Sequence, residues 1–192
     1  MPERQAVIFD FDGTLTKSYL DFDEIRAEIG IDGGPILEAI GEMNAEARAH
    51  AETILQRHEW EAARNAQLQP GAREVVAACR AHNVPVAILT RNARPTLDFV
   101  LDRYDLTVDA IRTRDDGAIK PSPEPVHSIC KQLGVTAASS WMVGDHLFDV
   151  RTGKAAGTRT VLFVDDGGLP QDTGGADHIV HRLEELLPLV LG

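Results

Sequence analysis

Short apolar runs alternate with amphipathic segments along most of this 192-residue chain. The apolar runs are typical of buried strands, and they lie at residues 6–9, 84–89, 110–112, 141–143, 160–164 and 176–180. Segments with helical spacing lie between them, at residues 72–82, 95–104, 123–133, 149–156 and 182–190. The glycine-rich stretch 167–175 indicates a loop. Strands that alternate with helices predict an α/β fold built on a doubly wound parallel sheet.

The alternation is interrupted after the first strand, where strand-like patterning disappears. Helical segments follow instead, at residues 22–30, 35–43 and 44–67. Asn44 is a suitable N-cap for the third of them, and Pro70 with Gly71 ends it. We therefore expect residues 17–69 to form a small helical insertion, with residues 1–16 and 70–192 as the core. The alternative is that these segments are additional core helices.

Composition and charge limit the classes of partner. Hydrophobic residues make up 43% of the chain and charged residues 26%, as in a globular protein with a sizeable core. The net charge of −11 argues against nucleic acid and anionic membranes as partners, because both favour a basic surface. No apolar stretch is long enough to span a membrane. We expect a monomer or homodimer.

The two cysteines, Cys79 and Cys130, are far apart in the sequence and predict no disulfide framework. The first residues show no basic-then-apolar signal pattern. Together these features predict a cytoplasmic protein.

Candidate chemistry appears where the first strand ends, in the run Asp10-Phe11-Asp12-Gly13-Thr14. In an extended backbone residues i and i+2 point the same way, so both carboxylates can face one small volume. Carboxylate oxygens suit Mg²⁺, which also leaves room for a phosphate group. Gly13 permits close backbone approach, and the amides around it can hold phosphate oxygens. An acidic turn after an ordinary strand is the alternative.

Polar groups also follow two later strands and one loop. Thr90, Arg91 and Asn92 come after the run 84–89, Lys120 follows an acidic loop, and Gly144-Asp145 with Asp149 comes after the run 141–143. In open parallel sheets, ligands bind beyond the carboxyl ends of the strands. A hydroxyl group, an ammonium group and further carboxylates are therefore expected beside Asp10.

These residues, in this order, resemble the haloacid dehalogenase-like phosphatases over nearly the whole chain. The resemblance implies that Asp10 is the nucleophile that forms an aspartyl phosphate and that Asp12 is the general acid and base. It also implies that Thr90 holds the phosphoryl group and that Lys120 stabilises nucleophile and phosphate. The expected cofactor is Mg²⁺, held by Asp10, Asp145 and a backbone carbonyl near Asp12, with Asp149 as a helper. Residues 17–69 correspond to the cap that this family inserts after the first strand.

The resemblance leaves several activities to weigh. A haloacid dehalogenase needs neither Mg²⁺ nor the second carboxylate, so Asp12 argues against it. A phosphonate hydrolase needs a cap lysine, yet no lysine lies between Lys17 and Lys120. A phosphomutase would share every core residue and differ in how the cap shields the aspartyl phosphate from water. A non-catalytic phosphate-binding module would have lost at least one catalytic position, and none is lost.

The expected substrate is a small phosphorylated metabolite, such as phosphoglycolate or a sugar phosphate. Gly13 and Thr14 are expected to bind its phosphate, while Arg91 and Asn92 lie at the mouth of the sheet and are expected to contact the rest. Arg57 and Arg64 share one face of the long predicted helix and are further candidates. A solvated stripe is the alternative for these two arginines.

Overall fold

The computed structural model describes residues 4–165, 168 and 172–192. Its sheet has the strand order β3-β2-β1-β4-β5-β6, and every neighbouring pair is parallel. The strands are β1 (Val7–Phe9), β2 (Val86–Leu89), β3 (Ala110–Arg112), β4 (Trp141–Gly144), β5 (Arg159–Phe163) and β6 (His178–Val180). This order reverses direction at β1, so the predicted doubly wound parallel sheet is confirmed.

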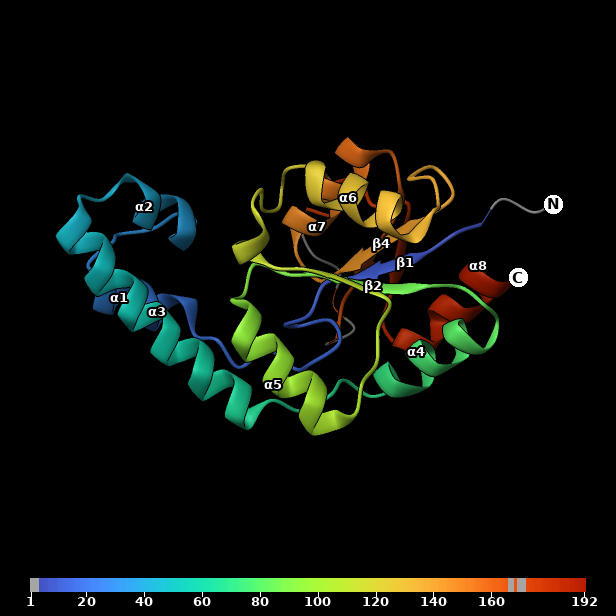
Figure 1. Cartoon of the computed structure of the whole chain (residues 1–192), viewed down its shortest axis with the longest axis horizontal. Coiled ribbons are helices and arrows are strands. Elements are labelled where there is room, and N and C mark those ends of the chain that lie inside the picture. The colour runs from blue at the N-terminus through green and yellow to red at the C-terminus, as the bar shows by residue number, and fades with distance from the viewer. Residues whose placement is uncertain (1–3, 166–167, 169–171) are drawn as a thin grey trace.

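Helices cover both faces of the sheet (Figure 1). Successive side chains of a strand point to opposite faces. Phe9 therefore packs with α4 (Ala72–Ala81), α5 (Arg94–Tyr104) and α8 (Leu187–Leu191), whereas Ile8 packs with α6 (Glu124–Leu133) and α7 (Leu147–Ala156). Two short 3₁₀ helices, η1 (Arg114–Asp116) and η2 (Leu183–Leu186), complete the core. Both cysteines are buried and free.

The segment after β1 contains α1 (Phe22–Ile29), α2 (Ile36–Glu42) and α3 (Ala45–Asn65). Asn44 caps α3, because its side-chain oxygen accepts a hydrogen bond from the Ala47 amide at 3.0 Å. These helices share a small apolar core of their own, formed by Ile25, Ile36, Ile40, Ala51 and Leu55. In Figure 1, α1 and α2 stand apart from the sheet, at the far end of α3. We call α1, α2 and the first half of α3 the cap.

The second half of α3 packs against the sheet-containing core. Ala63 and Ala66 belong to the main apolar cluster of the protein. Trp60 meets Phe99 of α5 edge to face, with 5.7 Å between ring centroids. The Tyr104 hydroxyl donates a hydrogen bond to the carbonyl of Ala66 at 2.7 Å. One helix thus connects the cap core with the main core, and the boundary at residue 69 stays a prediction.

The carboxyl-terminal segment differs from the sequence prediction of one helix over 182–190. The chain instead forms η2 and then the separate helix α8. Pro188 has no backbone N–H group, so it cannot donate the hydrogen bond that would continue a regular helix through this point. The predicted loop at 167–175 lies partly outside the described residues. No helix of the described chain is long and apolar enough to cross a membrane.

Candidate active site

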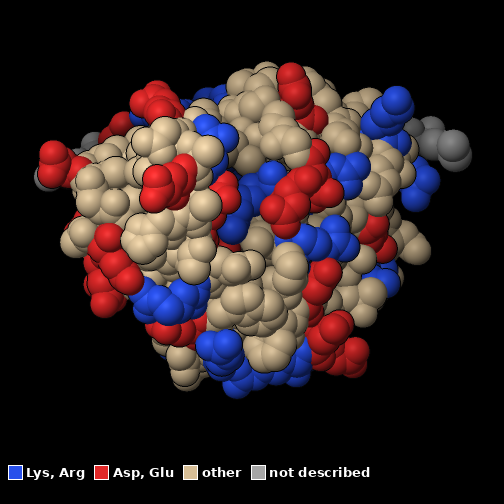
Figure 2. All heavy atoms as spheres, turned by 60° about the vertical axis from the view of Figure 1, so that its left-hand side comes forward, with Lys and Arg blue, Asp and Glu red and all other residues tan. Residues whose placement is uncertain are grey.

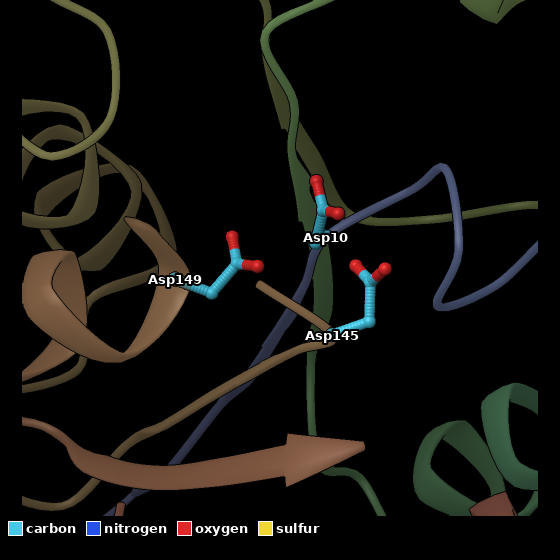
Figure 3. A group of neighbouring side chains, drawn as sticks. All are labelled: Asp10, Asp145 and Asp149. Carbon is cyan, nitrogen blue, oxygen red and sulfur yellow. The ribbon is translucent and has the colours of Figure 1, made fainter. Parts of the chain in front are cut away.

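Three carboxylates meet at the carboxyl edge of the sheet (Figure 3). Asp10 follows β1, Asp145 follows β4, and Asp149 lies in the first turn of α7. One oxygen from each lies within 4.8 Å of the other two. Asp10 and Asp149 are buried, whereas Asp145 is exposed to the cavity. Three hard oxygen donors this close together fit the ligand preference of Mg²⁺.

Lys120 lies between two of these carboxylates. Its Nζ donates hydrogen bonds to Oδ1 of Asp10 and, at 2.6 Å, to Oδ1 of Asp149. Burial alone would lower the pKa of Lys120, but the charges of Asp10 and Asp149 outweigh burial and hold this pKa above its ordinary value. Lys120 is therefore a fixed positive charge beside the predicted nucleophile.

One ammonium group does not balance three carboxylates. Loss of hydration and the charges of Asp10 and Asp149 raise the pKa of Asp145 to about 8. Burial and the charge of Asp10 raise the pKa of Asp149 to about 6, against the opposing effect of Lys120. A bound cation would relieve this repulsion and favour the ionised forms.

The pKa of Asp12 is set by burial, by a neighbouring charge and by a hydrogen bond. The side-chain amide of Asn92 donates a hydrogen bond to its Oδ2. Burial and the nearby charge of Asp10 nevertheless raise the pKa of Asp12 to about 7, despite that hydrogen bond. A carboxyl group with a pKa near neutrality can both give and take a proton, which is what a general acid and base requires.

The hydroxyl groups and Gly13 shape the same edge. Thr14 Oγ1 donates to Oδ1 of Asp145 at 3.2 Å, and Thr90 Oγ1 accepts from the Asn92 amide at 3.1 Å. Gly13 has a φ of +85°, and a Cβ atom there would lie 2.1 Å from Oδ2 of Asp145. Only glycine combines this backbone conformation with space for the neighbouring carboxylate.

A cavity of about 200 Å³ opens above these groups, between the core and the cap. The predicted site residues on its wall are Asp10, Asp12, Thr90, Arg91, Asn92, Lys120, Asp145 and Asp149. The structure therefore brings together the acidic, hydroxyl and ammonium groups expected from the sequence. Gly13 and Thr14, which the sequence predicts to bind the phosphate, are not among the lining residues; both lie against Asp145, and Thr14 is fully buried.

Arg57 and Arg64 are not among the residues that line this cavity. Arg57 pairs with Glu28 of α1, and the Arg64 guanidinium lies over the Trp60 ring, 5.9 Å from its centroid. Seven-residue spacing places both arginines on one face of α3, but that face turns away from the cavity. Glu59, two residues after Arg57 and so about 200° around the helix, lines the cavity instead.

A family comparison agrees with this arrangement. The family model for haloacid dehalogenase-like hydrolases matches residues 5–157, which include β1, the cap and every polar group described above. The chain belongs to this family. It is therefore an enzyme of the hydrolase class.

Relatives of this hydrolase span most of its length. A protein from Pseudomonas putida named N-acetylmuramic acid 6-phosphate phosphatase is 30% identical, over 94% of this chain and 93% of its own. A Chromobacterium violaceum protein named phosphoglycolate phosphatase is 28% identical, over 97% of this chain and 96% of its own. The crystal structure of a predicted phosphoglycolate phosphatase from Haemophilus somnus superposes with a TM-score of 0.78 at 18% identity, covering 98% of this chain and 99% of that one. That likeness confirms the fold.

Two ion pairs, each with one partner on the cavity wall, were not predicted from the sequence. Arg91 binds Glu38 of α2 through its two terminal guanidinium nitrogens, Nη1 and Nη2, at 3.0 and 2.5 Å. Arg114 of η1 binds Glu59 of α3, with the second contact at 2.8 Å. Each pair joins the core of this hydrolase to a helix of the insertion. One sequence signal could have indicated the second pair: Glu59 follows Leu55 by four residues, so both lie on the same face of α3, and both line the cavity.

His146 and Phe148 are further unpredicted members of the cavity wall. His146 begins α7, because its Nδ1 accepts a hydrogen bond from the Phe148 amide at 3.1 Å. Its backbone amide in turn donates to Oδ2 of Asp149 at 3.0 Å. This reciprocal capping holds Asp149 in place at the helix start. The spacing from His146 to Asp149 is the sequence signal that could have indicated such a cap.

Proposed function

We propose that this hydrolase is a Mg²⁺-dependent phosphatase that cleaves small phosphate monoesters through an aspartyl phosphate on Asp10. The observation that carries the proposal is the contact of Asp10 with Lys120 inside the cluster of Asp10, Asp145 and Asp149. The phosphatase names of the relatives support the same reaction class.

The donor set fits Mg²⁺. Both oxygens of Asp149 already have partners, the Lys120 Nζ and the His146 amide. Asp10 and Asp145 are therefore the better direct ligands, together with the backbone carbonyl near Asp12, and Asp149 positions Lys120. Bound Mg²⁺ would supply charge neutralisation for the phosphate, which otherwise repels the carboxylate nucleophile.

The first half-reaction needs a nucleophile and an acid. A carboxylate oxygen of Asp10 attacks phosphorus, and the bond from phosphorus to the ester oxygen breaks. Asp12 gives its proton to the departing oxygen, so the product is a neutral alcohol. Asn92 orients Asp12 through its amide hydrogen bond. Thr90 lies at the cavity wall, and we assign its hydroxyl to binding a phosphoryl oxygen.

The second half-reaction returns the enzyme to its starting state. Asp12, now a carboxylate, takes a proton from a water molecule as that water attacks phosphorus. The bond from phosphorus to Asp10 breaks, and inorganic phosphate leaves. A pKa of about 7 makes Asp12 suitable for both directions of proton transfer. Lys120 offsets negative charge on Asp10 and on the phosphoryl group throughout.

The decisive experiment measures phosphate release from a panel of phosphate monoesters with Mg²⁺, beside an Asp10→Asn control. We expect turnover by the wild-type enzyme, loss of activity in chelator and recovery on adding Mg²⁺. Full activity in chelator would contradict the proposal and favour a dehalogenase. Transfer of phosphate to a second hydroxyl group of the substrate, rather than to water, would indicate a phosphomutase.

A further inference from the structure

The cap side of the cavity is apolar. Its wall is formed by side chains from the loop before α1, from α1, from the start of α2 and from α3, namely Leu20, Phe22, Pro35, Ile36, Leu37 and Leu55. Phe148 adds an aromatic ring from the core side. Apolar surface covers most of the space in which the part of a substrate beyond its phosphate group must lie.

The cations beside this wall already have anionic partners in the described part of the chain. On the face shown in Figure 2, Lys and Arg side chains lie next to Asp and Glu side chains. Arg91 pairs with Glu38, donates to the Lys120 carbonyl at 2.6 Å and lies 4.6 Å from the centroid of the Phe148 ring. Arg26 pairs with Asp23 at 2.7 Å. Lys120 is held by Asp10 below the wall. An incoming carboxylate or second phosphate would therefore have to compete with a carboxylate of the protein for each of these cations.

Glu59, the acidic group that α3 contributes to the cavity, is paired as well. Glu59 is 4% exposed and binds Arg114. The cavity above the carboxylate cluster thus combines apolar contacts with charges that are paired across the protein itself. A polar or charged leaving group gains little there, whereas an apolar one removes hydrocarbon surface from water.

We propose that the preferred substrates carry an apolar, uncharged leaving group, an alkyl or aryl alcohol esterified to phosphate. This inference rests on the proposed phosphatase function and defines its substrate class. Leu37 and the neighbouring apolar side chains then select the leaving group. Glu38 disfavours substrates with a carboxylate, because it already binds Arg91. Esters such as phosphoglycolate are then poor substrates, because their carboxylate must displace Glu38 from Arg91.

The test compares alkyl phosphates with a phosphate ester of similar size that carries a free carboxylate, which we call the carboxylate ester. Phosphate release is measured with Mg²⁺ from ethyl, propyl and butyl phosphate and from 3-phosphonooxypropanoate. We expect kcat/KM to rise roughly fourfold with each methylene group added. Butyl phosphate is expected to exceed the carboxylate ester at least about tenfold, since the latter leaves its charge without a free partner.

Two variants assign the effect to named side chains. Leu37→Ala should lower kcat/KM for butyl phosphate about tenfold more than for ethyl phosphate. Its control is Ile29→Ala, because Ile29 packs in the cap core without lining the cavity. Glu38→Gln should raise kcat/KM for the carboxylate ester about tenfold by freeing Arg91. Its control is Glu42→Gln, on the exposed end of the same helix.

The outcomes separate this inference from the proposed function. A preference for the carboxylate ester, or equal rates for ethyl and butyl phosphate, would contradict the proposed preference for apolar leaving groups. Either result would leave the proposed phosphatase function intact. A Leu37→Ala variant that keeps the wild-type ratio of butyl to ethyl rates would also contradict that preference. Absence of phosphate release from every ester, with folded protein and Mg²⁺, overturns the phosphatase and this inference together.

Discussion

Gly144 leaves the space that the carboxyl group of Asp149 occupies: a Cβ atom at residue 144 would lie 2.2 Å from Cγ of Asp149. Asp149 in turn holds Lys120. The glycine at the end of β4 therefore determines, through two contacts, where the ammonium group beside Asp10 lies.

Gly144→Ala should consequently displace Asp149 and misplace Lys120. We expect kcat to fall about 10²-fold, as a misplacement of about 1 Å can cause. Steady-state kinetics measures it. Gly41→Ala is the control, because nothing lies within 4 Å of its Cβ position and alanine favours the helix it would join. Unchanged kcat in Gly144→Ala would show that the position of Asp149 does not matter for turnover.

Asp10→Asn should abolish turnover, because an amide cannot form the acyl phosphate. The expected loss is about 10⁴-fold or more in kcat. Mass spectrometry of the wild-type enzyme, quenched during turnover, should find phosphate on the peptide that contains Asp10. Asp32→Asn, at an exposed position, serves as the control. Substantial activity in Asp10→Asn would end the assignment.

Asp12→Asn should affect substrates according to their leaving groups. Alkyl phosphates need the proton that Asp12 supplies, so their rate should fall roughly 10²–10⁴-fold. Transfer from 4-nitrophenyl phosphate to Asp10 should suffer less, because nitrophenolate leaves without a proton. Rapid-quench kinetics separates this transfer from the later hydrolysis. Equal losses for both esters would exclude Asp12 as the acid.

The metal-free enzyme should lose stability as the pH rises. The pKa values of Asp149 and Asp145, about 6 and about 8, lie above the ordinary value of 3.8. Between roughly pH 4 and pH 8 the folded protein holds protons that the unfolded chain has lost, so raising the pH favours unfolding. In chelator, the melting temperature should fall across this window, and Mg²⁺ should reduce the fall.

Asp145→Asn isolates one contribution to that trend. In chelator at pH 8 the variant should be more stable than wild type by about 1 kcal/mol, a figure kept small because Asp145 is exposed to the cavity. The difference in stability between variant and wild type should vanish near pH 4. Mg²⁺ should no longer stabilise the variant. Thermal unfolding at both pH values measures this difference. A variant less stable than wild type in chelator at pH 8 would contradict the sign.

Arg114→Ala should destabilise the fold, because it leaves the buried Glu59 carboxylate without its partner. The expected cost is about 3–5 kcal/mol at pH 8. Burial raises the pKa of Glu59, so protonation should reduce the cost at pH 5. Chemical denaturation at both pH values measures it. Arg94→Ala, which breaks the exposed pair with Asp98, should cost less than about 1 kcal/mol. Equal costs for the two variants would show that Glu59 is adequately solvated.

The sheet and the carboxylate cluster could be predicted because their signals are local. Buried parallel strands are apolar throughout, so Val7, Ile8 and Phe9 mark β1 and Asp10 marks its end. Parallel strands then bring their carboxyl ends to one edge, which places Asp145 at the same edge as Asp10; the pairing of β1 with β4 makes the two neighbours.

The ion pairs and the cavity wall could not be predicted in this way. Arg91 and Glu38 are 53 residues apart, and Arg114 and Glu59 are 55 apart. Their contact depends on how the cap lies against the core, which no local pattern encodes. The spacing of Arg57 and Arg64 correctly places them on one face of α3, but helical periodicity does not determine which face meets the cavity.

The shared helix α3 ties the position of the cap to an aromatic contact with the core. Its 21 residues span about 30 Å, and Trp60 anchors it on α5. A rigid tilt of α3 would therefore pivot near Trp60. From there to Ala45 the helix is about 22 Å long, so a tilt of roughly 10° moves the far end by about 4 Å. A small adjustment in the packing of Trp60 against Phe99 would thus displace α2 several times farther than it displaces Trp60.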